Sequence, residues 1–320
     1  MTQKFKMTVP AIRLKITGKC NRSCAFCHQE GDMKEIEDVV ADEEFFDCIK
    51  TLTSILGVSR IMITGGEPTL HPQLKEIISN VKAKEISLTT NGIKLYNIEQ
   101  WQILKKAGLK KVAISVNDVL PEKFLQLEIK NRQRKWAETS LNNQFQNIIN
   151  LEIVGIPTRV NIVVYNNYIS VYEVIEKLRL FQKVNYFEIR LLNDLNHVEI
   201  SQGIISKVCD TLKVKEIQAC QRSGSSNVTR YYHAKDGFKF STKVSFPYFF
   251  APICDDCCIK RNCLEGFYGV RVEKRKGEYF IRLCLYKQSS EVLMPWKVFI
   301  NTGLAEKIKA ISKKINPSAF

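Results

Sequence analysis

Cys20-Asn-Arg-Ser-Cys24-Ala-Phe-Cys27 is the stretch that decides the fold of this 320-residue chain, and it directly follows an apolar, strand-like run at residues 11–16. Three thiolates on one short loop can bind three irons of a four-iron, four-sulfur cube. No further cysteine follows before Cys48, so the fourth iron would be left for a ligand that the protein does not supply. Close thiolates also bind zinc, but structural zinc usually takes four protein ligands in paired Cys-x2-Cys knuckles. The spacing therefore favours iron–sulfur chemistry.

A second motif, Gly65-Gly66-Glu67-Pro68, follows the strand-like residues 60–63. This motif and the cysteine spacing, with Phe26 before the last thiol, together resemble the signature of the radical S-adenosylmethionine (SAM) superfamily. The resemblance implies that SAM binds the open iron through its amino and carboxylate groups, and that one electron breaks its sulfonium carbon–sulfur bond. It also implies that the resulting 5′-deoxyadenosyl radical takes a hydrogen atom from the substrate. An external flavodoxin- or ferredoxin-like donor would supply the electron.

Strand-like and helix-like stretches alternate along the first 195 residues, which is the pattern of βα units around a parallel sheet. We expect strands at residues 11–16, 60–63, 85–89, 111–116, 158–164 and 186–191, and helices at 45–56, 73–81, 98–107, 141–154 and 171–181. These units predict an α/β fold with a partial (β/α)6 TIM-like barrel over residues 1–200. Active sites of such barrels lie at the carboxyl ends of the strands. The two motifs are therefore expected to meet on one rim.

Further cofactor and substrate contacts are expected at the other strand ends. By resemblance to the family, the SAM-binding residues are Gly65, Gly66, Glu67, Pro68, Ser115, Asn117, Asn161 and Leu192. Arg159, Arg190 and Arg271 are candidate substrate contacts, because arginine binds phosphate and carboxylate groups in a bidentate manner. A polar side chain at a strand end can equally be merely solvated, and Leu192 can equally belong to the core.

A second group of cysteines lies within residues 201–320, which we expect to form a smaller C-terminal domain with a hairpin at residues 228–246. Cys254 and Cys257 have the spacing of a metal knuckle, and a dense cysteine cluster in a reducing compartment indicates metal rather than disulfides. We expect Cys254, Cys257 and Cys284 to be ligands of a second [4Fe–4S] cluster, Cys263 to be the fourth ligand and Cys258 to be a bystander. A zinc knuckle is the alternative.

The hairpin that leads to Cys284 resembles the Twitch extension of the molybdenum-cofactor GTP cyclases (MoaA-like enzymes), which carries an auxiliary cluster. It contains Arg271 and a turn sequence, Lys276-Gly277. Gly269 stands where the cyclases have the first arginine of an Arg-x-Arg pair, and the interval from Cys257 to Cys284 is longer than theirs. These departures indicate a relative of the cyclases with an altered substrate.

The charge of the chain is strongly basic, with 48 Lys and Arg against 33 Asp and Glu and a net charge of +15. Such an excess favours a phosphorylated or nucleotide partner, although lysines on solvated faces would give the same count. One dense run, Lys130-Asn-Arg-Gln-Arg-Lys135, lacks regularly interleaved aromatic residues, so a nucleic-acid partner is not expected. No apolar stretch is long enough to span a membrane, and no signal peptide precedes the first strand. Eleven cysteines then predict a cytoplasmic protein.

Four functional hypotheses follow. The leading one is a radical SAM enzyme that acts on a small polar, nucleotide- or sugar-like molecule in specialised metabolism. A second is a maturase of ribosomal peptides, although the short segment before residue 11 leaves no room for a leader-binding domain. A third is a genuine molybdenum-cofactor GTP cyclase. The fourth is a zinc-stabilised nucleic-acid-binding protein without enzymatic activity.

Overall fold

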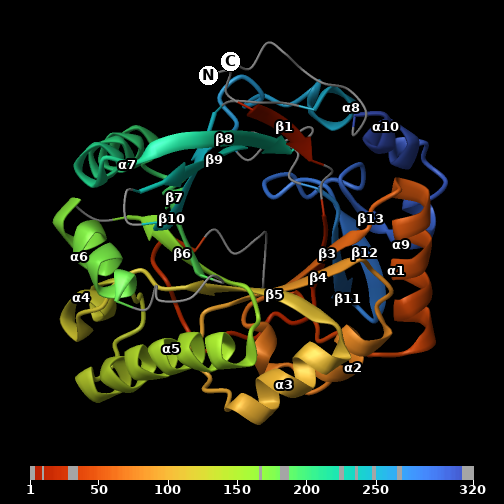
Figure 1. Cartoon of the computed structure of the whole chain (residues 1–320). Helices are drawn as coiled ribbons and strands as arrows, with labels where there is room; N and C mark the ends of the chain where they lie inside the picture. Colours follow the sequence, from red (N-terminus) through yellow and green to blue (C-terminus); the bar gives the residue numbers. More distant parts are fainter. Residues whose placement is uncertain are drawn as a thin grey trace.

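One curved sheet of 13 strands organises the protein (Figure 1). The structure is a computed structural model, and it describes residues 4–8, 11–27, 35–165, 168–180, 187–222, 227–234, 237–246, 250–264 and 269–311. The strand order is β1-β8-β9-β10-β7-β6-β5-β4-β3-β2-β11-β12-β13. Figure 1 shows this sheet curling into a ring, with helices on its outer side.

The middle of the sheet is the predicted partial barrel of six parallel strands. They are β2 (Ile12–Lys15), β3 (Arg60–Thr64), β4 (Glu85–Thr90), β5 (Leu109–Ser115), β6 (Thr158–Val164) and β7 (Phe187–Asn193). The helices between them are α1 (Glu43–Leu56), α2 (Leu74–Asn80), α3 (Ile98–Ala107), α4 (Pro121–Gln126), α5 (Arg134–Val154) and α6 (Tyr168–Arg179), and a 3-10 turn spans Pro68–Leu70. The α/β partial barrel is therefore confirmed. Helix α4 was not expected, and residues 181 and 186, at the ends of two predicted elements, lie outside the described residues.

The two faces of the parallel strands differ in character because side chains alternate along a strand. Aliphatic side chains such as Leu14, Ile63 and Ile162 face the helices and form the main core. Helix α1 shows how the sequence sets this packing: Asp42 Oδ1 accepts a hydrogen bond from Phe45 N (2.9 Å) at its start, and Gly57 ends it in the left-handed conformation. The opposite face of the strands, inside the ring, carries mainly polar side chains. This differs from closed TIM barrels, whose interiors are filled mainly by branched apolar side chains.

The C-terminal third extends the barrel sheet at both of its edges. Its elements are α7 (Val198–Leu212), β8 (Lys215–Arg222), β9 (Asn227–His233), β10 (Lys239–Ser245), α8 (Ala251–Cys254), β11 (Arg271–Arg275), β12 (Glu278–Arg282), β13 (Leu293–Pro295), α9 (Trp296–Phe299) and α10 (Leu304–Ile311). Strand β10 joins β7 in parallel, β11 joins β2 in parallel, and β8 pairs with β1 (Lys4–Thr8). The division into domains at residue 200 stays a prediction, since both parts contribute to one sheet.

Both predicted hairpins are present as antiparallel pairs, β9–β10 and β11–β12. Lys276 and Gly277 form the turn of the second one, with φ of 48° and 80°, the conformation that a two-residue hairpin turn requires. Residues 235 and 236 of the first turn lie outside the described residues. None of the helices in the described part of the chain combines the length and apolar character that crossing a bilayer demands.

Candidate active site

The cysteine loop and the glycine-rich motif meet on one rim of the sheet, as the sequence predicted. Gly66 N donates a hydrogen bond to Thr17 O (2.8 Å), and Glu67 N donates to Lys19 O (2.7 Å). A Cβ atom added to Gly66 would lie 2.3 Å from Lys19 O, and one added to Gly65 would lie 2.5 Å from Thr17 O. The two glycines are therefore needed because the backbone of the cysteine loop lies directly against them.

Gly66→Ala is expected to push the cysteine loop away from the rim and to lower the unfolding free energy by about 1–3 kcal/mol, as overpacking generally does. The atoms that would clash belong to the backbone, so they cannot move aside as a flexible side chain could. Urea denaturation and iron content after anaerobic loading measure the two effects. Gly203→Ala on α7 is the matched control, because its Cβ would meet nothing within 4 Å. Equal behaviour of the two variants would contradict this explanation.

Glu67 is a buried carboxylate whose oxygens are engaged by the protein itself. Oε1 accepts hydrogen bonds from Thr69 N (3.0 Å), Thr69 Oγ1 (2.6 Å) and Thr90 Oγ1 (2.6 Å), and Oε2 accepts one from Asn91 N (2.6 Å). Burial raises the pKa of Glu67, and these four donors oppose that rise. Glu67 thus fixes the ends of two neighbouring strands relative to each other.

Asn91 and Gln144 also belong to this rim, and neither was predicted from the sequence. Asn91 Nδ2 donates to Asn21 Oδ1 (2.7 Å) in the cysteine loop and lies 3.9 Å from Cys20 Sγ. Gln144 Nε2, from α5, donates to Asn91 O (2.7 Å) and Ser115 O (2.9 Å). Asn91 follows β4 directly, so a polar residue at a strand end was the available signal. Nothing in the local sequence of α5 marks Gln144.

A buried ion pair holds the other side of the cysteine loop. Glu128, just after α4, lies 2.6 Å from Arg22 Nη2, and both side chains are almost completely buried. Glu128 Oε2 also accepts from Ser23 N (2.8 Å), and Ala25 N donates to Leu127 O (2.8 Å). These contacts hold the loop against a segment more than 100 residues away in the sequence. No local motif predicts this pairing.

The three thiols of the loop are at or near the surface: Cys20 and Cys27 are exposed and Cys24 is half-buried. Burial raises the pKa of Cys24 to about 12, so this thiol keeps its proton at neutral pH until a metal displaces it. Within the described residues no three His, Cys, Asp or Glu side chains converge as they would around one metal ion. A cube does not need such convergence, because each thiolate binds a different iron.

The remaining predicted SAM contacts lie at the ends of β5, β6 and β7. Ser115 and Asn161 are partners in the β5–β6 register, and Leu192 alternates with the core residue Leu191, so it faces the interior of the ring. Asn117 Oδ1 accepts from Val163 N (2.8 Å). Its Nδ2 is buried and has no hydrogen-bond partner within the described part of the chain. Because a buried donor without a partner costs free energy, this amide fits a site that a polar ligand completes.

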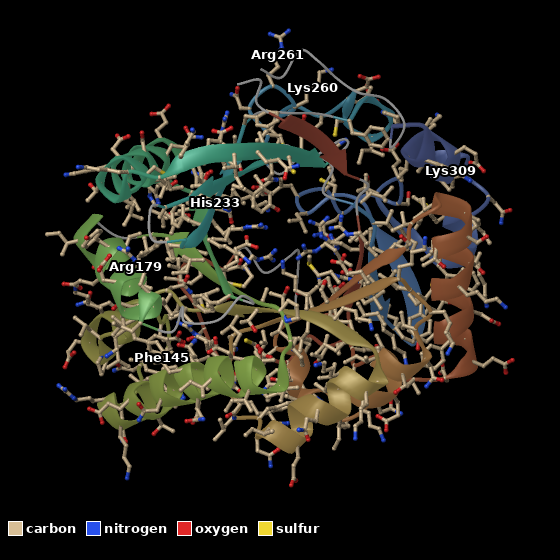
Figure 2. All side chains as sticks on the ribbon, in the orientation of Figure 1. Phe145, Arg179, His233, Lys260, Arg261 and Lys309 are labelled. Atoms are coloured by element: carbon tan, nitrogen blue, oxygen red, sulfur yellow. The ribbon has the colours of Figure 1, made fainter. Side chains whose placement is uncertain are left out.

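Cationic side chains line the inner face of the ring where β2, β11 and β12 lie together. The buried charged residues there are Arg13, Lys15, Arg271, Arg275, Arg282 and Glu273. Arg271 is in register with Arg13 on β2 and with Arg282 on β12. Figure 2 shows side-chain nitrogen atoms gathered inside the ring of strands. Arg275 also pairs with Glu35, whose side chain is exposed. The buried cations still outnumber the one buried carboxylate of this group, which makes this part of the interior attractive to anions.

Arg159 and Arg190, two of the three predicted substrate contacts, lie together on the neighbouring strands β6 and β7, across the ring from β11 (Figure 1). Arg159 Nε donates to Asn161 Oδ1 (2.9 Å). Arg190 donates to Ser241 Oγ (2.9 Å) and to Glu188 Oε1 (2.7 Å). Burial alone would raise the pKa of Glu188, but Arg190 and other nearby cations lower it to about 2. Arg271 therefore belongs to a different part of the interior from the other two arginines.

The second group of cysteines also comes together. Cys254, Cys257, Cys263 and Cys284 line one pocket, along with the side chains of Ile253, Ile259, Lys260, Tyr286 and Lys287. Cys258, the predicted bystander, is exposed and is not among the residues that line the pocket. The structure thus brings together the four cysteines that the sequence singled out as ligands.

Comparison with known proteins agrees with this geometry. Residues 14–178, just over half of the chain, match the family model for the Radical SAM superfamily. The GTP 3′,8-cyclase of Aquifex aeolicus is 29% identical over 280 residues, which cover 83% of this chain and 82% of that protein. The probable GTP 3′,8-cyclase of Methanocaldococcus jannaschii is 42% identical over 127 residues, which cover 39% of this chain and 42% of that protein. This chain thus spans less than half the length of such archaeal relatives.

Among solved structures, Streptococcus suis SuiB bound to the precursor peptide SuiA superimposes with a TM-score of 0.50 at 17% identity, over 64% of this chain and 46% of that one. At that identity the likeness concerns the fold alone. The family implies SAM and a [4Fe–4S] cluster as cofactors. The three thiols of the rim fit them, as does the buried Asn117 Nδ2, which has no partner among the described residues. The matched family model, the partial barrel and this donor set lead to one conclusion: the chain belongs to the radical SAM superfamily and is an enzyme.

Proposed function

We propose that this radical SAM enzyme removes a hydrogen atom from an anionic, nucleotide- or sugar-like small molecule that binds inside the ring of strands. The proposal rests on the cationic inner face of the ring. Five buried cations share this face with one buried carboxylate, Glu273, and they are Arg13, Lys15, Arg271, Arg275 and Arg282. Arginine suits phosphate and carboxylate groups because its planar fork donates two parallel hydrogen bonds.

Cys20, Cys24 and Cys27 would hold the [4Fe–4S] cluster. SAM would lie against the strand ends at Gly65, Gly66, Glu67, Pro68, Ser115, Asn117, Asn161 and Leu192. When bound, the cofactor pair supplies a 5′-deoxyadenosyl radical by reductive cleavage of SAM. The contribution of this chain is to keep the two rim loops together through Gly66 and Glu67 and to offer the Asn117 amide as a donor. An external one-electron donor and a cytoplasmic location belong to the proposal. The eleven cysteines of the chain suit a reducing compartment, where thiols serve metals rather than disulfides.

A second [4Fe–4S] cluster in the pocket of Cys254, Cys257, Cys263 and Cys284 is part of the proposal. Four thiols around one pocket support a closed cluster, which would transfer electrons or stabilise the fold rather than bind substrate. The zinc knuckle remains the alternative for this pocket. Metal analysis after anaerobic reconstitution distinguishes iron from zinc.

GTP cyclisation is the second candidate, because the Aquifex aeolicus relative named for that activity aligns with most of the chain. The deciding experiment supplies SAM, a small-molecule reductant and one uniformly deuterated candidate substrate at a time, beginning with GTP and other nucleotides. We expect mass spectrometry to find deuterium in 5′-deoxyadenosine with an anionic nucleotide or sugar phosphate. Deuterium transfer from a peptide instead would favour the maturase hypothesis and overturn this proposal. Membership of the family already sets aside the non-enzymatic hypothesis.

A further inference from the structure

The basic run singled out in the sequence lies directly beside the cysteine loop. Ile129 N donates to Ser23 O (2.7 Å), and Lys130 N donates to Ser23 Oγ (3.0 Å). Arg132 Nη2 reaches Asn21 O at 3.5 Å. Because these contacts are made to the backbone and short side chains of the loop, the run is fixed next to the thiols that would hold the cluster.

The surface that this run presents carries positive charge and one apolar side chain. We call Ile129, Lys130, Arg132, Arg134 and Lys135 the basic face. Ile129 is 74% exposed, and Lys130, Arg134 and Lys135 are exposed as well. Arg134 forms ion pairs with Glu122 and Glu138. Lys130 and Lys135 form no ion pair with any residue in the described part of the chain, so their charges are available to a partner.

We propose that the basic face is the docking surface for an acidic one-electron carrier protein that reduces the cluster. The inference rests on the proposed function, because only a cluster at Cys20, Cys24 and Cys27 gives the carrier an acceptor. In the transfer the carrier loses one electron and the cluster gains it, and no bond or proton changes place. Opposite charges accelerate such an encounter and orient the two proteins. Because the basic face lies against the cysteine loop, a carrier bound to it is oriented next to the cluster that it reduces.

The test reverses charge on the basic face and measures reduction of the reconstituted cluster by reduced flavodoxin. We expect Lys130→Glu combined with Lys135→Glu to lower the second-order rate constant about tenfold at low ionic strength and to remove most of its salt dependence. The matched control is Lys82→Glu combined with Lys84→Glu, which changes the net charge equally. These two exposed lysines precede β4, at the end of the sheet opposite the cysteine loop, so the control should stay within about twofold of the parent rate.

Two further measurements separate this proposal from the proposed function. Reduction by photoexcited deazaflavin, a small molecule, should be the same in all three proteins and shows that each carries a reducible cluster. Binding of oxidised flavodoxin to the chain without its three loop cysteines should weaken on reversal of Lys130 and Lys135, independently of any activity. An unchanged flavodoxin rate in the Lys130/Lys135 variant, an equal loss in the control, or salt-dependent binding of RNA in place of flavodoxin would overturn the docking surface. Failure of deazaflavin to reduce the parent protein would instead overturn the proposed function.

Discussion

Replacing Cys20, Cys24 and Cys27 together by alanine is expected to remove about four of about eight irons per chain and to abolish the formation of 5′-deoxyadenosine from SAM. The three thiols are the only ligands that we propose for that cluster. Within the described residues, the nearby carboxylate of Glu67 already accepts four hydrogen bonds from the protein, so it is a poor substitute for a lost thiolate. Iron and sulfide analysis with chromatography of 5′-deoxyadenosine measures the result.

Cys258→Ala is the control for this experiment. Cys258 is exposed and does not line the second cysteine pocket, so its loss should leave both the iron content and SAM cleavage unchanged. Continued production of 5′-deoxyadenosine by the triple variant would refute the assignment of the loop. A triple variant that lost all eight irons would show instead that the two sites do not load independently.

The second large effect is expected from Glu273→Gln. The Glu273 carboxylate is completely buried between Lys15 Nζ (2.9 Å), Arg275 Nε (2.6 Å) and Arg282 Nε (3.1 Å). Burial opposes its ionisation, but the charges of Lys15 and Arg282 hold the pKa of Glu273 below its usual range. Removing this buried negative charge while Lys15, Arg275 and Arg282 stay buried should lower the unfolding free energy by about 3–5 kcal/mol. Urea denaturation at pH 7 measures the change, and Glu306→Gln on the exposed side of α10 is the control.

Lys15 gives this prediction a pH dependence with a definite sign. Burial lowers the pKa of Lys15 from 10.5 to about 8, although Glu273 opposes the shift. Between these two values the unfolded chain holds the proton and the folded chain does not, so this group makes stability rise with pH in that window. Without Glu273 the pKa of Lys15 falls further and the window widens towards lower pH. The deficit of the variant should therefore be smaller at pH 9 than at pH 7, and an equal deficit at both would contradict the coupling.

The barrel and its rim were predictable because their signals are local. Each parallel strand is a short apolar run, and strand ends share one edge of the sheet, which placed Cys20–Cys27 beside Gly65–Pro68. Helix α7 and strand β8 were not predicted, because the regular alternation of strand-like and helix-like stretches ends near residue 200. The pairing of β1 with β8 and of β2 with β11 joins segments far apart in the sequence. No periodicity within either segment encodes such partners.

The same limit explains what was missed in the site. The ion pair of Arg22 with Glu128 joins residues 106 apart in the chain. From sequence alone, the basic run at residues 130–135 is indistinguishable from a solvated surface, and only the fold shows that it lies next to the cysteine loop. Arg271 was expected to contact substrate, but its buried neighbours Lys15 and Glu273 were not predicted, because a single charged residue in a strand-like run has no distinctive sequence pattern. Contacts across the sheet, rather than local motifs, decide which of these charges lie in the interior.

The cysteine loop is anchored on two sides by the polypeptide alone, through Thr17 and Lys19 to the glycine-rich motif and through Ser23 to Glu128. Its backbone is therefore preorganised, and assembling a cluster there need not bear the entropic cost of ordering a free peptide. If oxygen destroyed the cluster, the empty loop would keep its conformation. Repair would then require reinsertion of iron and sulfide, without refolding of the protein.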